Sequence, residues 1–327
     1  GWNDRVAALR LAAPIRAAAR GRPTGRPDET VAAWLDRHGQ TARLRDYLWD
    51  PLALAALNQP ADVARVETFE RVLAEMFGRG DRGDAALVIP TRPLHETYAE
   101  PARRRIEAGG GRVRTGAPAQ VVLADGQAQV HAEGQTWAGV PVVVAVPWFG
   151  LGATFAGDTT PLRATLEAAA ATAASPIVTV NLWYDRPVLP EPMVGLPGRV
   201  MQWVFDTRQT WRTDASALSL VSSGADEIAG LTNPALIETA TRELGEALPA
   251  ARAATLVRAT VIREPKATFS LAPGQPPRPA TRTAVPALYL AGDWIATGLP
   301  ATIESGVRSG HLAADAVLAD SRSPGPA

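Results

Sequence analysis

The segment from Ala287 to Leu318 constrains the fold more than any other part of the sequence. Its first residues, Leu288 to Ala291, form an apolar run typical of a buried strand, and the run ends at Gly292 and Asp293. Pro300 stands where it can begin a helix, which we expect from about Ala301 to Ala319. The segment therefore predicts a strand, a loop and a helix packed together, as in α/β proteins.

The residue types around this loop suggest a ligand site. Gly292 lets the backbone approach a ligand closely, and Asp293 offers a carboxylate to the hydroxyl groups of a sugar-like polyol. The backbone N–H groups of Ala301, Thr302 and Ile303 would be unpaired at the helix start, with the positive end of the helix dipole behind them. These small residues leave room for a flat ring. The alternative is a purely structural unit in which Asp293 only caps a turn.

The rest of the chain changes pattern along its length. Residues 1–77 have helical spacing throughout, with Pro14 interrupting the first run and Asp28 or Thr30 as the N-cap of a later helix. A helix from about Pro93 to Ala108 precedes residues 112–147, which alternate like short strands joined by turns. Further helices are predicted at about 161–173 and 234–248, strands at 177–185, 199–206, 216–224 and 256–264, and a loop at 273–286.

Composition and motifs exclude several kinds of chemistry. The chain of 327 residues has no Cys and a formal net charge of +0, so we expect no disulfide, no thiolate metal site and no general attraction for nucleic acid. Its four histidines are scattered, which predicts that no metal is bound. A strand followed by Gly150 and Gly152 begins like a dinucleotide-binding loop, but Phe155 occupies the third glycine position. Lys266 is the only lysine.

The first 27 residues are strongly basic. Six arginines and one aspartate give this segment a local net charge of +5. One interpretation is a solvated helical face, and the other is peripheral contact with anionic lipid. The chain also starts at Gly1 without Met, which we interpret as the start of a fragment.

The last strand and helix carry a family resemblance. LYLAGDWIATGLPATIESGVRSG (288–310) resembles the C-terminal FAD-binding motif of the flavin-dependent amine oxidase and phytoene desaturase superfamily, in the form of the squalene-associated desaturases, or hydroxysqualene dehydroxylases. Further matches follow the same order along nearly the whole chain: WDPLALAALNQP (49–60), VVVAVPW (142–148), PIVTVNLWYDRPVL (176–189), MQWVFD (201–206) and REPKATFSLAPG (263–274).

This resemblance implies FAD as the cofactor and assigns residues to it. Asp293, after Gly292, would bind the ribityl or pyrophosphate region, and Ala301 to Ile303, after Pro300, would lie at the N1–C2=O edge of the flavin. The run from Ala145 to Pro147 would pass beside the ADP half. Ala119 occupies the position where relatives usually have a Val against the adenine.

The resemblance also implies a mixed α/β (α+β) fold in which two domains interleave. We expect residues 1–84 to form the helical, membrane-facing part of a substrate domain, and 151–264 its sheet and helices. Residues 85–150 and 265–327 would be the middle and C-terminal segments of an amine-oxidase-like FAD-binding domain. This FAD-binding domain would be incomplete, because residues 1–80 contain no G-x-G-x-x-G unit of the kind with which the family begins. We therefore expect weak or no FAD binding by this chain alone.

The implied activity is reductive removal of the hydroxyl of hydroxysqualene to give squalene, on a route to hopanoids, by a cytoplasmic enzyme peripheral to the inner membrane of a bacterium. One alternative is a carotenoid-type or phytoene-type prenyl desaturase, and another is a non-catalytic lipid-binding protein. Amine oxidation has no support beyond the lone lysine. In each case the partner would be an isoprenoid lipid.

Candidate residues for this chemistry remain open. Lys266 is the first candidate for the acid that assists loss of the hydroxyl, followed by Asp185 and Glu304, although each has a surface salt bridge as its simpler interpretation. Apolar residues of the substrate-domain strands are candidates for the pocket wall or for ordinary core, and period 2 does not say which face meets the ligand. These residues are Leu182, Trp183, Met201, Trp203 and Phe205.

Overall fold

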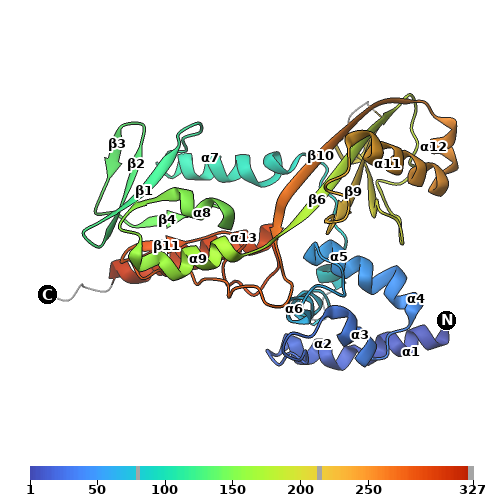
Figure 1. Ribbon diagram of the computed structural model, residues 1–327, viewed down its shortest axis with the longest axis horizontal. Helices are drawn as coiled ribbons and strands as arrows, with labels where there is room; N and C mark the ends of the chain where they lie inside the picture. Colours follow the sequence, from blue (N-terminus) through green and yellow to red (C-terminus); the bar gives the residue numbers. More distant parts are fainter. Residues whose placement is uncertain (79–81, 212–215, 323–327) are drawn as a thin grey trace. The chain divides into compact units, whose positions relative to one another are not determined.

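The computed structural model describes residues 1–78, 82–211 and 216–322, and the chain forms two compact units (Figure 1). Unit 1 consists of Gly1–Val113 and Ala174–Thr268, and unit 2 of Arg114–Ala173 and Phe269–Ala327. The chain therefore interleaves two units. The boundaries follow residues 113, 173 and 268, whereas the sequence suggested 84, 150 and 264. Residues 151–173 belong to unit 2 because their strand pairs with the first strand of that unit.

The first part of unit 1 is helical, as predicted. Thr30 caps α3 because its Oγ1 accepts a hydrogen bond from the N–H of Ala33. The first break falls at Leu11, while Pro14 lies inside the first turn of α2, where its missing N–H costs nothing. The elements are α1 (Trp2–Arg10), α2 (Ala12–Ala19), α3 (Val31–Arg37), α4 (Ala42–Leu44), the π-helical turn η1 (Arg45–Trp49), α5 (Asp50–Leu57), α6 (Val66–Phe77), η2 (Arg82–Ala85), η3 (His95–Ala99) and α7 (Glu100–Ala108).

The second part of unit 1 is a five-stranded sheet in the order β10-β6-β9-β8-β7. Its antiparallel pairs β6·β9, β8·β9 and β7·β8 set Asn181 opposite Ser219, Ser219 opposite Phe205, and Phe205 opposite Met193. Residues in such a row lie on one face of the sheet. The strands are β6 (Ala174–Tyr184), β7 (Met193–Gly195), β8 (Trp203–Asp206), β9 (Ala217–Ser223) and β10 (Leu256–Phe269).

A helix covers one face of this sheet and forms a hydrophobic core with it, whereas the side chains of the other face lie outside that core. The even-numbered residues of β6, from Val178 to Tyr184, are buried with Leu236, Ala240 and Leu244 of α11 (Asn233–Ala247). Figure 1 shows α11 and α12 (Pro249–Ala253) beside these strands. The short helix α10 (Thr207–Trp211) follows β8. We call the opposite face, which carries Asn181, Trp183 and Phe205, the open face of the sheet.

Unit 2 contains the predicted meander. Strands β1 (Ala119–Ala124), β2 (Gln127–Ala132) and β3 (Gln135–Trp137) are antiparallel neighbours. Both hairpin turns have two residues with positive φ, Asp125 with Gly126 and Glu133 with Gly134, as tight hairpins require. The remaining elements are β4 (Val142–Val144), α8 (Trp148–Thr154), β5 (Phe155–Gly157), η4 (Thr160–Leu162), α9 (Arg163–Ala171), β11 (Leu288–Leu290) and α13 (Ile303–Arg322).

Candidate functional site

The predicted ligand site lies where β11 ends in unit 2. β11 pairs in parallel with β4, and the N–H of Ala291 donates to the carbonyl of Val144 at 3.0 Å. Gly292 follows with φ +135°, and a Cβ there would lie 2.8 Å from Cδ1 of Trp294. Only glycine fits this conformation and this contact. Because Gly292 has no side chain, a ligand can approach the backbone closely directly before Asp293.

The side chain of Asp293, directly after Gly292, is half-buried. Burial raises the pKa of its carboxyl above the ordinary value, although the N–H groups of Asp293 and Trp294 and the charge of Arg278 act in the opposite direction. Its carbonyl oxygen accepts a hydrogen bond from Ser305 Oγ at 2.7 Å. A largely desolvated carboxylate is well suited to accept hydrogen bonds from ligand hydroxyl groups.

Arg278 organises the loop after Asp293. Its guanidinium donates to the carbonyls of Asp293 (2.9 Å), Trp294 (3.0 Å) and Leu299 (2.6 Å), to the carbonyl of Ile295 and to Oγ1 of Thr297 (3.1 Å). The guanidinium also lies 4.6 Å from the ring centre of Phe269. Burial lowers its pKa to about 10, so it stays charged at neutral pH. Arg278 is not among the residues that the sequence predicts for the site, because an arginine inside a Pro-rich loop carries no local signal.

The helix α13 begins at Ile303, two residues later than predicted. Thr302 is its N-cap, since Thr302 Oγ1 accepts from the N–H of Ser305 at 3.1 Å. In the described part of the chain, the N–H groups of Ala301, Thr302 and Ile303 have no hydrogen-bond partner. Pro300, which precedes them, is buried. The helix start therefore offers free donors, as the sequence suggested.

The residues suggested for the ADP half lie at strand ends of unit 2. Ala145 and Pro147 follow β4 and are exposed, and Pro147 leads directly into α8. Gly150 and Gly152 lie inside α8, so this segment forms no glycine-rich loop. Ala119 is exposed at the start of β1, opposite Ala132.

The candidate acids lie in different places. Lys266 is exposed on β10, and Glu304 is exposed in the first turn of α13. Asp185 forms an ion pair with Arg186 at 2.9 Å and accepts from the N–H of Thr255 at 2.9 Å. The hydrogen bond from Arg186 and then that from Thr255 lower its pKa to about 2. Asp185 is therefore ionised near neutral pH and is poorly suited to donate a proton.

The suggested pocket residues separate by face. Trp183, Trp203 and Phe205 lie on the open face, and Arg258 stands 4.8 Å from the ring centre of Trp183. Trp203 also borders a cavity of about 750 Å³ within unit 1, which η1 and α5 line on the other side. Met201 is wholly buried in the core with α11, as is Leu182, so neither belongs to the open face. Strand periodicity alone does not say which face of the sheet is core; the helices that pack on one face show that the core lies there.

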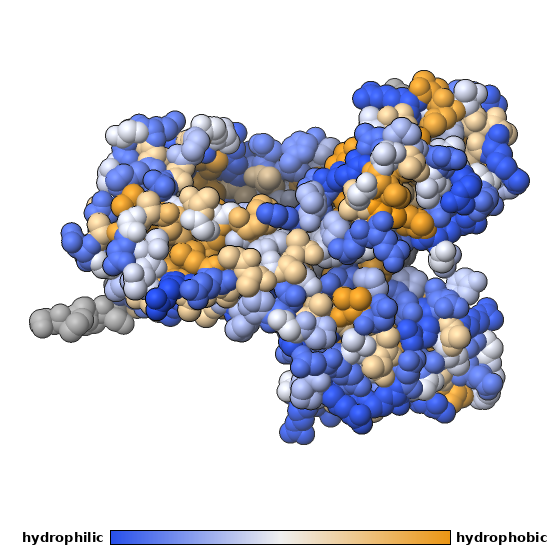
Figure 2. Space-filling model, in the orientation of Figure 1, coloured by the Kyte–Doolittle hydropathy of each residue, from blue (hydrophilic) through white to orange (hydrophobic). Residues whose placement is uncertain are grey.

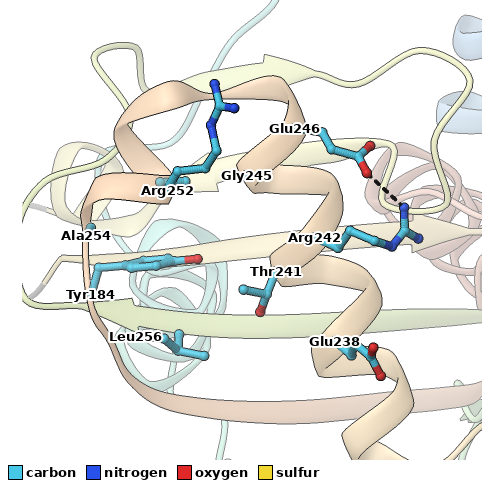
Figure 3. A pocket seen from close by; sticks show the side chains of 10 residues that line it. Tyr184, Glu238, Thr241, Arg242, Gly245, Glu246, Arg252, Ala254 and Leu256 are labelled. Carbon is cyan, nitrogen blue, oxygen red and sulfur yellow. Dashed lines mark hydrogen bonds and ion pairs between the residues drawn. The ribbon is translucent and has the colours of Figure 1, made fainter.

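A second cavity of about 610 Å³ lies on the covered side of the same sheet (Figure 3). The hydroxyl of Tyr184 points toward Thr241 of α11, and neither hydroxyl hydrogen-bonds to a described protein group. Arg242 and Glu246 form an ion pair at its rim. This cavity belongs to a different environment from the open face, because Tyr184 and Trp183 point to opposite sides of β6.

The residues that the structure describes hold no group of three or more His, Cys, Asp or Glu side chains that could bind a metal ion. Among the helices that the structure describes, none combines the length and the hydrophobicity that a membrane span requires.

Known proteins resemble the chain in sequence. Hydroxysqualene dehydroxylases of Rhodopseudomonas palustris and Zymomonas mobilis are 31% and 27% identical over 85% and 84% of the chain. The chain covers only 64% and 63% of these two relatives. A 15-cis-phytoene desaturase of an Oncidium hybrid is 26% identical over 44% of the chain and is covered over 27% of its own length.

Solved structures share the fold. An oxidoreductase from Methanosarcina mazei superimposes over 99% of the chain and 73% of its own length, with a TM-score of 0.71 and 18% identity. Putrescine oxidase superimposes over 97% of the chain and 76% of its own length, with a TM-score of 0.66 and 18% identity.

The family assignment follows from a match that spans nearly the whole chain. The sequence profile of the family described as "Flavin containing amine oxidoreductase" matches residues 2–318. The site fits a nucleotide that carries a polyol and a flat ring. Gly292 lets such a ligand approach the backbone, Asp293 offers a half-buried carboxylate, and the start of α13 offers free N–H donors. The chain belongs to the flavin-containing amine oxidoreductase family, and its cofactor is a flavin.

Proposed function

We propose that the protein is a prenyl oxidoreductase that removes the hydroxyl group of hydroxysqualene to give squalene. The observation that carries this proposal is the identity of 31% over 85% of the chain with a hydroxysqualene dehydroxylase. The open face of the unit 1 sheet supports it, because aromatic side chains there suit a hydrocarbon substrate.

The proposed reaction replaces a hydroxyl by hydrogen. The C–O bond of the alcohol breaks, a C–H bond forms at the same carbon, and the oxygen leaves as water after it accepts one proton. Reduced FAD supplies the hydride, and with it both electrons, when it is bound. The protein must then exclude water from the carbon and deliver the proton.

Trp183, Trp203 and Phe205 would exclude water. All three side chains are partly buried, although they lie on the open face. Gly195 leaves room for the Trp203 ring, since a Cβ at Gly195 would lie 3.1 Å from it. The three aromatic rings make this part of the open face apolar. A C30 chain would bury a large apolar area against such a surface.

Lys266 is the acid that we propose. Lys266 is exposed within the segment REPKATFSLAPG (263–274) that carries part of the family resemblance, whereas the hydrogen bond and ion pair with Arg186 hold Asp185 in the carboxylate form. Residues Ala259 and Val261 of β10 pack against the core, so the alternating side chains of that strand point to the open face. Lys266 follows this alternation toward the end of the strand.

Phytoene-type desaturation is the second candidate, favoured by the similarity to the phytoene desaturase of the Oncidium hybrid. Protein supplied with excess FAD, whose binding is verified by absorbance, is incubated with hydroxysqualene under reducing conditions, and separately with phytoene and an oxidant, and the products are identified by gas chromatography with mass spectrometry. We expect squalene from the first reaction and unchanged phytoene from the second. Desaturated products without squalene would establish the alternative, and no product from either would favour a non-catalytic lipid-binding protein.

We also propose that residues 1–27 contact the membrane from which such a substrate comes. All six arginines of this segment are exposed, and none forms a salt bridge within the residues that the structure describes. Trp2 and Leu9 of α1 are 76% and 72% exposed. Basic groups beside exposed aromatic and aliphatic side chains are typical of segments that lie in the interface of an anionic bilayer.

A further inference from the structure

A polar pair interrupts the apolar open face of the unit 1 sheet. Asn181 of β6 and Ser219 of β9 are directly opposite each other, and Ser219 Oγ donates to Asn181 Oδ1 at 2.8 Å. Phe205 of β8 continues the same row, and Trp183 is two residues along β6. Both polar residues are partly buried. The pair therefore lies among the aromatic side chains that would hold a hydrocarbon.

The hydrogen bond fixes the orientation of the amide. Because Asn181 Oδ1 accepts from Ser219, its Nδ2 must carry two N–H donors on the other side of the group. These donors make no further hydrogen bond within the residues that the structure describes. An oriented amide with free donors, placed in a partly desolvated apolar surface, is a site for an oxygen acceptor.

We propose that the Asn181–Ser219 pair binds the hydroxyl oxygen of a prenyl alcohol and so selects the alcohol over the parent hydrocarbon. The inference rests on the proposed function and names the residues that would recognise the hydroxyl group of its substrate. Asn181 is a positioning residue in this role: its N–H donates to the alcohol oxygen, while Ser219 holds the amide in the correct orientation. A hydrocarbon would leave these donors unpaired, which weakens its binding.

Selectivity is measured directly by competition. FAD-loaded protein is equilibrated with equal amounts of hydroxysqualene and squalene in detergent, separated from free lipid by gel filtration, and the two bound lipids are quantified by mass spectrometry. We expect wild-type protein to retain the alcohol about tenfold over the hydrocarbon, the ratio that one hydrogen bond of about 1.4 kcal/mol gives. Asn181→Leu should bring the ratio close to one while total bound lipid is preserved.

Three further variants make the test specific. Ser219→Ala frees the amide to rotate and should lower the ratio severalfold, which also tests the inference if Asn181→Leu does not fold. Tyr184→Phe removes a hydroxyl from the cavity on the covered side of the same strand (Figure 3), and Thr179→Val removes one from the next row of the open face. We expect both to keep the wild-type ratio.

The outcomes separate the inference from the function on which it rests. A wild-type ratio that persists in both Asn181→Leu and Ser219→Ala overturns the role of the pair while the proposed substrate stands. A ratio lost in Tyr184→Phe or Thr179→Val instead would also overturn it, because the hydroxyl would then bind elsewhere. If wild-type protein retains neither lipid, the proposed function fails, and the inference with it.

Discussion

We expect Asp293 to lower the stability of the folded protein at neutral pH. Its folded pKa is raised above the unfolded value, mainly by burial, so folding favours the protonated form and loses stability as pH rises through the folded pKa. Asp293→Asn removes this cost. We expect the flavin-free variant to melt at a higher temperature than wild type at pH 7, and the difference to shrink as pH falls toward 4. The same variant should retain less FAD, because a carboxylate accepts hydroxyl hydrogen bonds more strongly than an amide does.

Asp320 provides the matched control, because its pKa is shifted in the opposite direction. Hydrogen bonds from Arg282 and from the hydroxyl of Tyr289 lower the pKa of this exposed carboxyl. Asp320→Asn should therefore give no gain in melting temperature at pH 7. Equal gains in both variants would show that removal of a negative charge, and not burial of Asp293, is responsible.

Arg278 is expected to hold the loop from Asp293 to Leu299 in shape. Arg278→Lys replaces a planar group with five N–H donors by a single ammonium, which cannot reach the carbonyls of Asp293, Trp294 and Leu299 together. We expect a loss of about 3 kcal/mol in the free energy of unfolding, measured by urea denaturation, and a lower FAD content by absorbance. Arg282→Lys, at an exposed ion pair, should change unfolding by less than about 1 kcal/mol. Similar losses in both variants would contradict the special role of Arg278.

Lys266 is tested through turnover. If its ammonium donates the proton, Lys266→Met in FAD-loaded protein should lower turnover of hydroxysqualene by roughly two to four orders of magnitude, with unchanged FAD content. Lys266→Arg keeps the positive charge but is a far weaker acid, so it should remain strongly impaired. Wild-type turnover in Lys266→Met would exclude Lys266 as the acid.

The loop after β11 and the start of α13 could be predicted because their signals are local. Gly292 and Asp293 directly follow the apolar run of β11, and Pro300 comes three residues before Ile303, where α13 begins. Arg278 and Ser305 contact the same loop from outside it, at separations that no local pattern records. Arg278 reaches this loop because the segment before β11 folds back onto the strand, where Arg282 forms a bridge with Tyr289, and Ser305 reaches it from the first turn of α13.

Glu70 of α6 ties the basic N-terminal segment to the helices. Its buried carboxylate accepts from the N–H of Thr24 (2.8 Å), the N–H of Gly25 (2.9 Å) and Oγ1 of Thr24 (2.6 Å). Glu70→Gln places an amide donor against these donors, and we expect a loss of about 2 kcal/mol in unfolding free energy. Glu67→Gln, on the exposed side of the same helix, should stay within about 0.5 kcal/mol of wild type. An equally small change at Glu70 would show that the loop does not depend on it.

At the scale of whole elements, sequence patterns located most helices and strands but not the faces they cover. Alternation in β6 shows that Leu182 and Trp183 point to opposite sides, yet both are apolar. The packing of α11 against Val180 and Leu182 assigns the core to the even-numbered residues. Strand β10 also continues to Phe269, five residues beyond its predicted end, because Glu264 to Lys266 are polar or Pro and lack an apolar pattern.

At the scale of the whole molecule, the family resemblance implied that two units interleave, while the boundaries of these units depend on contacts between distant segments. β5 joins β1 in parallel, and this pairing of Phe155 with Val121 places residues 151–173 in unit 2. Local composition does not predict the pairing of strands that lie this far apart in the sequence.

The membrane contact that we propose for residues 1–27 is tested on the whole protein by sedimentation with liposomes. Figure 2 shows mainly hydrophilic side chains on the visible surface of the N-terminal helices, so attraction to anionic lipid should depend largely on charge. Changing Arg5, Arg10, Arg16 and Arg20 to Gln should weaken binding to anionic vesicles by two to three orders of magnitude, at about 1 kcal/mol per residue. Changing Arg103, Arg104, Arg105 and Arg112, which are also exposed, alters net charge equally and should have little effect. Wild-type binding should fall with added salt and be weak on neutral vesicles. If the first variant sediments as wild type does, or both variants lose binding equally, residues 1–27 are not the membrane contact.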